Sequence, residues 1–267
     1  VVIMQKVDMV TMQVVRNALQ SITDEMNMAL IRTAYSTNIK DRRDCSCAIY
    51  TAKGEVISQT ELGSPVHLGI MPSALDKVFE KFRLEDLEEG DHVIVNVPYP
   101  NGPGHLNDVT MVSPVHIGGK IAFLVANMAH HVDMGGFAPG SMALGLREIF
   151  QEGLQLPPVK IVRKGVFDQS IVDIIRQNVR TPGEVAGDLH AQMACNNVGR
   201  KRLGELCQRY DVATLYGYIE ALFDYSERRI RAGLKSIPLG SYTFEDFIEG
   251  TPYTPEFIKV KATVTVK

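Results

Sequence analysis

The chain has 267 residues, 45% of them hydrophobic and 22% charged, with a formal net charge of −3. These values are typical of a globular protein with one large domain or two small ones. The sequence contains no cluster of lysine and arginine and no apolar run near the roughly 18 residues of a membrane span, so we expect neither nucleic acid nor a membrane as a partner.

Helical spacing of apolar residues predicts a long amphipathic helix from residue 8 to about residue 35, with Asp8 as its N-cap. A β-hairpin that turns at Lys53-Gly54 is predicted next. After a loop, a further helix is predicted from about Ser73 to Phe82. The segment DHVIVNV then predicts a strand, and the Pro/Gly-rich PYPNGPG predicts a loop.

The stretch DVTMVSPVHIGGKIAFLVANMA predicts a second hairpin, which turns at Gly118-Gly119. A glycine-rich loop over residues 130–146 follows, and long loops of this kind are commonly functional. Thr181 begins a helix that is expected to reach about Tyr210, and Asp211 caps another that ends near Gly233. YTFEDFIEG and KVKATVTVK alternate as strands. We therefore expect an α+β fold, in which antiparallel β-hairpins form a sheet packed with long amphipathic helices.

The chain starts with VVIMQKV and ends on an alternating strand pattern without a closing turn. We expect residues 1–267 to form a single domain that is the N-terminal half of a longer polypeptide. The four cysteines are interpreted as free thiols, because Cys45 and Cys47 lie two apart and fit neither a CxxC metal knuckle nor a redox pair. Free thiols and the missing signal-peptide pattern favour a cytoplasmic protein.

The second hairpin carries the strongest candidate site. His105 and Asp108 stand where its first strand begins, and His130, His131 and Asp133 stand where its second strand ends. In an antiparallel pair, these two ends lie side by side. Imidazoles favour Zn, Fe, Ni or Mn, an added carboxylate favours Mn or Fe, and the absence of nearby thiolate argues against a structural zinc site.

Other interpretations of these residues stay open at this stage. A single histidine at a strand end is more often a hydrogen-bonded core or surface residue than a ligand. Three glutamates could add ligands or acid–base groups: Glu61, Glu148 and Glu152. The charged stretch 41–46 is interpreted as a solvated turn, and His190 as an exposed side chain. Serine nucleophile, P-loop and dinucleotide motifs are absent.

Several motifs together resemble the hydantoinase B family, which comprises N-methylhydantoinase B subunits, the C-terminal part of 5-oxoprolinases and the α subunits of acetone and acetophenone carboxylases. The motifs are RRDCSCAIYTAKGEVISQ, PVHLGIMPSAL, NVPYPNGPGHLNDVTMVSPV, AHHVDMGGFAPGSM, EIFQEGLQLPP and NVRTPGEVAGDLHAQ. The resemblance covers nearly the whole chain. Two positions depart from the usual family pattern: Val97 replaces an aspartate, and Cys45 replaces a phenylalanine.

The resemblance implies a division of labour between two proteins. A hydantoinase A-type partner would bind ATP and phosphorylate the substrate, and this chain would hold a divalent metal (Mn, Fe or Zn). It implies His105, Asp108 and His130 as metal ligands, with His131 and Asp133 in the surrounding shell, orienting the ligands or moving protons. We take His131, Asp133 and Glu152 as the catalytic candidates.

The resemblance leaves three functions open. The first is metal-assisted hydrolysis of an activated cyclic amide, such as a hydantoin or 5-oxoproline, in a hetero-oligomer. The second is carboxylation of a ketone, with this chain as the α subunit. The third is a non-catalytic role in assembly. Metal-assisted hydrolysis is chemically reasonable, because a divalent ion can make water nucleophilic and neutralise an oxyanion.

Overall fold

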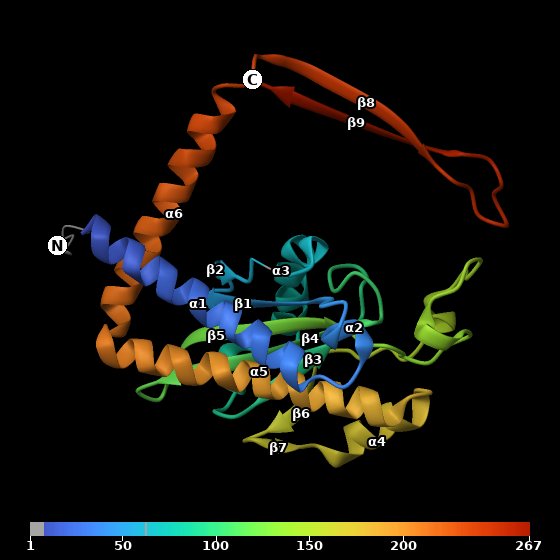
Figure 1. The fold of residues 1–267 in the computed structure, drawn as a ribbon, viewed down its shortest axis with the longest axis horizontal. Coiled ribbons are helices and arrows are strands. Elements are labelled where there is room, and N and C mark those ends of the chain that lie inside the picture. The colour runs from blue at the N-terminus through green and yellow to red at the C-terminus, as the bar shows by residue number, and fades with distance from the viewer. Residues whose placement is uncertain (1–7, 62) are drawn as a thin grey trace.

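Seven antiparallel strands form the central sheet of the protein, shown in Figure 1. The computed structural model describes residues 8–61 and 63–267. The strand order is β2-β1-β5-β4-β3-β6-β7, so the hairpin of β4 and β5 lies at the centre. These strands are β1 (Cys45–Thr51), β2 (Val56–Gln59), β3 (His92–Val95), β4 (Asp108–Ile117), β5 (Lys120–His130), β6 (Val159–Arg163) and β7 (Val166–Phe167).

Helices cover both faces of this sheet. The helices are α1 (Met9–Thr33), α2 (Thr37–Lys40), α3 (Pro65–Phe79), α4 (Gln169–Asn178), α5 (Pro182–Arg209) and α6 (Val212–Leu234). Helices α1 and α5 pack on one face, where Phe123 and Val125 of β5 enter their hydrophobic core. Helix α3 packs on the other face against Leu124 and Ala126, the alternate residues of the same strand. The α+β prediction, with antiparallel hairpins packed by long helices, is confirmed.

Most predicted elements agree with the structure. Helix α1 begins after Asp8, whose carboxylate accepts hydrogen bonds from two backbone amides of the first turn. Both predicted hairpins are present, and the predicted helices after Thr181 and Asp211 correspond to α5 and α6. Both helices therefore follow their sequence signals to within a few residues.

The prediction of a helix from Ser73 to Phe82 is wrong at both ends, because α3 already begins at Pro65 and ends at Phe79. The early start places Pro72 inside the helix, where proline usually costs about 3 kcal/mol. Burial of apolar side chains from both halves of α3 against the sheet offsets this cost; they include Met71 and Leu75. This early start matters for the site, because it makes residues 65–72 helical.

Four of these helices and strands were not predicted: α2, β6, β7 and α4. The two strands have five and two residues, which is too short for a clear alternating pattern. Strands β6 and β7 extend the sheet beyond β3. Helices α4 and α5 pack on this part of the sheet, in one hydrophobic cluster with Ile161 and Val162 of β6.

Helix α6 and the hairpin of β8 (Gly240–Ile248) and β9 (Ile258–Val266) project from the body of the protein in Figure 1. Within the described part of the chain, these two strands form a separate two-stranded sheet, and they are exposed along almost their full length. The loop at the far end of this hairpin contacts the residue that follows the glycine-rich loop, since the Arg147 guanidinium lies 3.5 Å from the ring centre of Tyr253. Across residues 8–61 and 63–267, none of the helices combines the length and apolar character needed to traverse a lipid bilayer.

Candidate metal centre

The start of β4 and the end of β5 bring two histidines and an aspartate together. Asp108 and His130 are direct partners in the β4–β5 ladder, and His105 lies in the short segment just before β4. One potential ligand atom from each of the three residues lies within 4.8 Å of the other two. Two imidazoles and one carboxylate at this spacing fit a divalent cation and leave coordination positions free for water or substrate.

Contacts within this cluster set its protonation. The His105 Nε2 atom lies 3.3 Å from the Asp108 carboxylate, and the His105 and His130 ring centres are 4.8 Å apart. Burial acts to raise the pKa of Asp108, but its contacts with His105 and His67 outweigh burial and hold that pKa well below its usual range. The contact with Asp108 raises the pKa of His105, whereas burial lowers the pKa of His130. An anionic Asp108 and a neutral His130 are the forms that bind cations.

Asn38 of α2 contacts the ring of His130 from the side. The Asn38 Nδ2 and His130 Nδ1 atoms are 2.9 Å apart. With the amide turned so that its oxygen faces Nδ1, Asn38 accepts a hydrogen bond from Nδ1–H, which fixes the ring and leaves the Nε2 lone pair available to a metal. The segment before α2 is itself held by Asp188 of α5, which accepts hydrogen bonds from the backbone amides of Tyr35 and Ser36.

The neighbouring His131 points away from the cluster. Successive residues leave a strand on opposite faces, so His130 lies on the α3 face and His131 on the α5 face. His131 is fully buried, and its Nε2 atom lies 3.0 Å from Oε1 of Gln192. Burial lowers the pKa of His131, so its ring is held neutral. The His131 side chain therefore lies on the opposite face of the sheet from the cluster of His105, Asp108 and His130.

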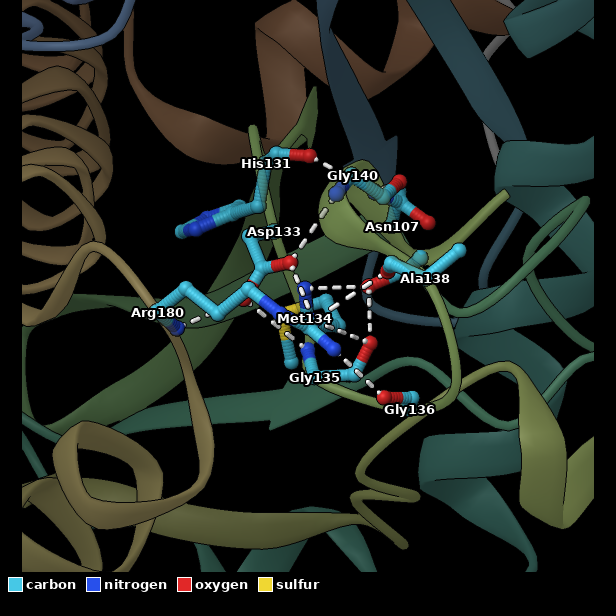
Figure 2. A network of polar contacts seen from close by, with 10 residues as sticks. Asn107, His131, Asp133, Met134, Gly135, Gly136, Ala138, Gly140 and Arg180 are labelled. Atoms are coloured by element: carbon cyan, nitrogen blue, oxygen red, sulfur yellow. Dashed lines mark hydrogen bonds and ion pairs between the residues drawn. The ribbon is translucent and has the colours of Figure 1, made fainter. Parts of the chain in front are cut away.

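Asp133 anchors the glycine-rich loop, as Figure 2 shows. Its carboxylate accepts hydrogen bonds from the amides of Gly135 and Gly140 and forms an ion pair of 3.0 Å with Arg180. The Arg180 guanidinium also donates to the carbonyls of Gly135, Gly136 and Ala138. Asp133 is buried and does not belong to the group of convergent ligand atoms. Its contacts define the path of the loop that follows β5.

Two glycines of this loop are required by close backbone contacts. Gly135 and Gly136 have φ values of 87° and 77°. A Cβ on Gly135 would lie 2.3 Å from the carbonyl oxygen of Asn178, and one on Gly136 would lie 2.4 Å from that of Gln151. The two glycines therefore allow the backbone after β5 to pass close to neighbouring backbone segments where a side chain would not fit.

The three candidate glutamates have different surroundings. Glu152 is half-buried, and its charge helps to raise the pKa of His105. It also lines a cavity of about 300 Å³ together with residues 141–146 of the glycine-rich loop. Glu61 and Glu148 are exposed and do not belong to the group of convergent ligand atoms. Of the three, Glu152 is the one whose charge acts on the cluster.

Two residues near the centre were not predicted. His67 of α3 is 1% exposed, and its Nε2 atom lies 3.8 Å from the Asp108 carboxylate and 3.7 Å from that of Asp44. Asp44 directly precedes β1 and belongs to the stretch predicted to be a solvated turn; its side chain is 38% exposed. Both residues lie in motifs that carry the family resemblance, RRDCS and PVHLG. These motifs were the sequence signal that could have identified the two residues as part of the site. His190, by contrast, is exposed as predicted.

Comparison with known proteins identifies the family. The Hydantoinase B/oxoprolinase family pattern matches residues 8–267. The chain is 32% identical to the putative D-/L-hydantoinase B subunit of a Pseudomonas species over 250 residues, which cover 92% of this chain and 42% of that protein.

Two solved structures resemble the fold. The ATP-dependent caprolactamase of Pseudomonas jessenii superimposes with a TM-score of 0.91 at 31% identity, over 98% of this chain and 45% of that one. An acetone carboxylase has a TM-score of 0.83 at 18% identity, over 94% of this chain and 35% of that one. At this identity the comparison supports a common fold and nothing further. The chain thus spans less than half the length of these relatives. With the family pattern matched from residue 8 to residue 267, the chain belongs to the Hydantoinase B/oxoprolinase family.

Proposed function

We propose that this chain binds a divalent metal through His105, Asp108 and His130, and that it hydrolyses a cyclic amide activated by an ATP-dependent A-type partner. The convergence of these three side chains at the end of the central hairpin carries the proposal. The names of the relatives, a hydantoinase B subunit and an ATP-dependent caprolactamase, supply the reaction class.

The donor set suits manganese or iron, and also zinc, because all three accept imidazole and carboxylate ligands. A bound divalent cation supplies a water of lowered pKa and polarises a carbonyl or phosphoryl oxygen. Phosphorylation of the carbonyl oxygen by the partner would make an unreactive amide carbon more electrophilic. No nucleotide-binding motif occurs in this sequence, which agrees with ATP chemistry on the partner.

We assign the remaining roles in binding and catalysis to individual side chains of this chain. Asp108 supplies negative charge at the centre, and Asn38 holds the ring of His130. Glu152, whose charge contributes to the raised pKa of His105, is our candidate for accepting the proton of the attacking water. Asp133 holds the loop path, and His131 holds the backbone below the centre, so we assign positioning roles to these two rather than contact with substrate.

The experiment is elemental analysis of the native complex, followed by turnover assays with ATP and hydantoins, lactams or ketones. We expect about one divalent metal per chain and ring opening of a cyclic amide. The variant His105→Ala should lose both, and His190→Ala serves as the control because its ring is exposed and remote from the ligand group.

Three results would contradict parts of this proposal. Bicarbonate-dependent consumption of a ketone with conversion of ATP to AMP would identify a carboxylase instead. A native complex without metal, with unchanged turnover in His105→Ala, would identify a non-catalytic role in assembly. Metal binding with substrate turnover unaffected by Glu152→Gln would remove Glu152 from the mechanism.

A further inference from the structure

His67 occupies a buried position between two carboxylates. It stands in the first turn of α3, close to Asp108, and α3 is fixed to the sheet by its apolar face. The Nε2 atom of His67 lies 3.7 Å from an oxygen of Asp44 and 3.8 Å from an oxygen of Asp108. Its Nδ1 atom lies 3.1 Å from the Ser46 hydroxyl. Both ring nitrogens therefore face polar partners.

These partners determine where the ring carries its proton. Ionised carboxylates only accept hydrogen bonds, so the nitrogen that faces Asp44 and Asp108 must present an N–H group. The Ser46 hydroxyl, which can donate or accept, lies within hydrogen-bond distance of Nδ1. With a hydrogen on Nε2, this atom has no lone pair for a cation. His67 thus differs in role from His105 and His130.

We propose that His67 is a positioning residue, whose Nε2–H group lies 3.7 Å from the Asp44 carboxylate and 3.8 Å from that of Asp108 and holds both near His105 and His130 by electrostatic attraction. The inference rests on the proposed metal centre and adds a residue to it. Side chains that orient metal ligands typically change metal affinity by about 10–100-fold when they are removed. Ser46 acts one step further away, because its hydroxyl contacts the other ring nitrogen of His67.

The test compares two substitutions of similar length in the full native protein, His67→Gln and His67→Met. Glutamine retains an N–H donor at the end of its side chain, whereas methionine fills similar space without one. Mn²⁺ affinity is measured from the electron paramagnetic resonance signal of free Mn²⁺ during titration. We expect His67→Met to bind Mn²⁺ about 10–100-fold more weakly than the wild type. The His67→Gln variant should recover most of that loss, and Ser46→Ala should show an intermediate loss.

A matched control separates positioning from general damage to the core. His92 is also fully buried and also contacts a serine, with Nδ1 of His92 2.6 Å from the hydroxyl of Ser113. His92→Met should reduce thermal stability without changing Mn²⁺ affinity. Equal affinities for wild type, His67→Gln and His67→Met would overturn the inference and leave the proposed metal centre standing. A wild-type protein that binds no divalent metal would overturn the proposed function itself and the inference that rests on it.

Discussion

Asp108 and His130 are directly opposite residues in the β4–β5 ladder, at the first position of one strand and the last of the other. Their side chains leave the sheet on the same face, toward α3, because paired residues of an antiparallel ladder share a face. The relative placement of these two candidate ligands is therefore a property of the hairpin and not of a loop.

Removal of one ligand should abolish metal binding while preserving the fold. His130→Ala deletes a half-buried ring at the end of β5 and removes little packing. We expect loss of bound metal by elemental analysis and turnover at the background rate, with an unchanged circular dichroism spectrum. Unfolding of both His130→Ala and Asp108→Asn would instead show that the cluster is a structural element.

Loss of Arg180 should loosen the glycine-rich loop. Arg180→Ala leaves the buried carboxylate of Asp133 without its ion pair and removes the donors to three loop carbonyls. Because Arg180 is partly exposed, we expect a destabilisation of about 2 kcal/mol in chemical denaturation. Hydrogen exchange at residues 134–141 should rise. Unchanged exchange there would show that the loop holds its path without this contact.

The buried amide network below the centre should be sensitive to apolar substitution. Gln192 donates to the Val109 carbonyl and to Asn127, and its side-chain oxygen contacts His131. Gln192→Leu leaves these partners unsatisfied in the core, which costs about 1–3 kcal/mol for a buried polar group. Urea denaturation measures this loss, and His190→Leu, on an exposed position of the same helix, is the control. Equal stability of both variants would contradict the importance of the network.

Acid should destabilise the protein through His92. Burial, followed by the charge of Arg200, lowers the pKa of His92 to about 4, below the value of about 6.5 expected in the unfolded chain. Between these values the unfolded state binds more protons, so stability is complete above pH 6.5 and falls as the pH decreases toward 4. The total contribution is about 3 kcal/mol. The slope of unfolding free energy against pH should flatten in His92→Gln; an unaltered slope would assign the acid sensitivity to other groups.

The four thiols should differ in reactivity. Burial raises the pKa of Cys45 to about 12, and Cys47 and Cys195 are also fully buried with their sulfur atoms 3.4 Å apart. Cys207 is half-buried. A thiol-specific chromogenic reagent at pH 8 should therefore modify Cys207 first in the native protein. Cys207→Ser should remove that early reaction, and rapid labelling that persists in this variant would contradict the buried placement of the other three.

Much of the fold could be predicted because its main elements are long and periodic. The central hairpin, α1, α5 and α6 each carry a repeating apolar pattern with clear caps or turns. The start of α3 was missed because Pro72 resembles a helix boundary, although tertiary packing keeps it inside the helix. Strands β6 and β7 were missed because so few residues establish no period.

The site could be predicted to the extent that one hairpin determines it. The pairing of β4 with β5 was sufficient to bring His105, Asp108 and His130 together. The same alternation along β5 separates His131 from His130, which the sequence interpretation did not use. His67 and Asp44 reach the centre through the packing of α3 and the segment before β1, and no local sequence period encodes such packing.

Two matching repeats connect α5 to β4. Gln192 and Asn196, one helical turn apart, donate to the carbonyls of Val109 and Met111, two residues apart on the strand. Four residues of helix rise about 6 Å and two residues of strand about 6.6 Å, so the spacings nearly coincide. Sliding the helix by a single residue would unpair both amides at once. Because Asp188 lies on the same helix, this match of spacings also fixes its position. Asp188 binds the backbone amide of Ser36 directly before α2, so it in turn fixes the position of Asn38 against the ring of His130.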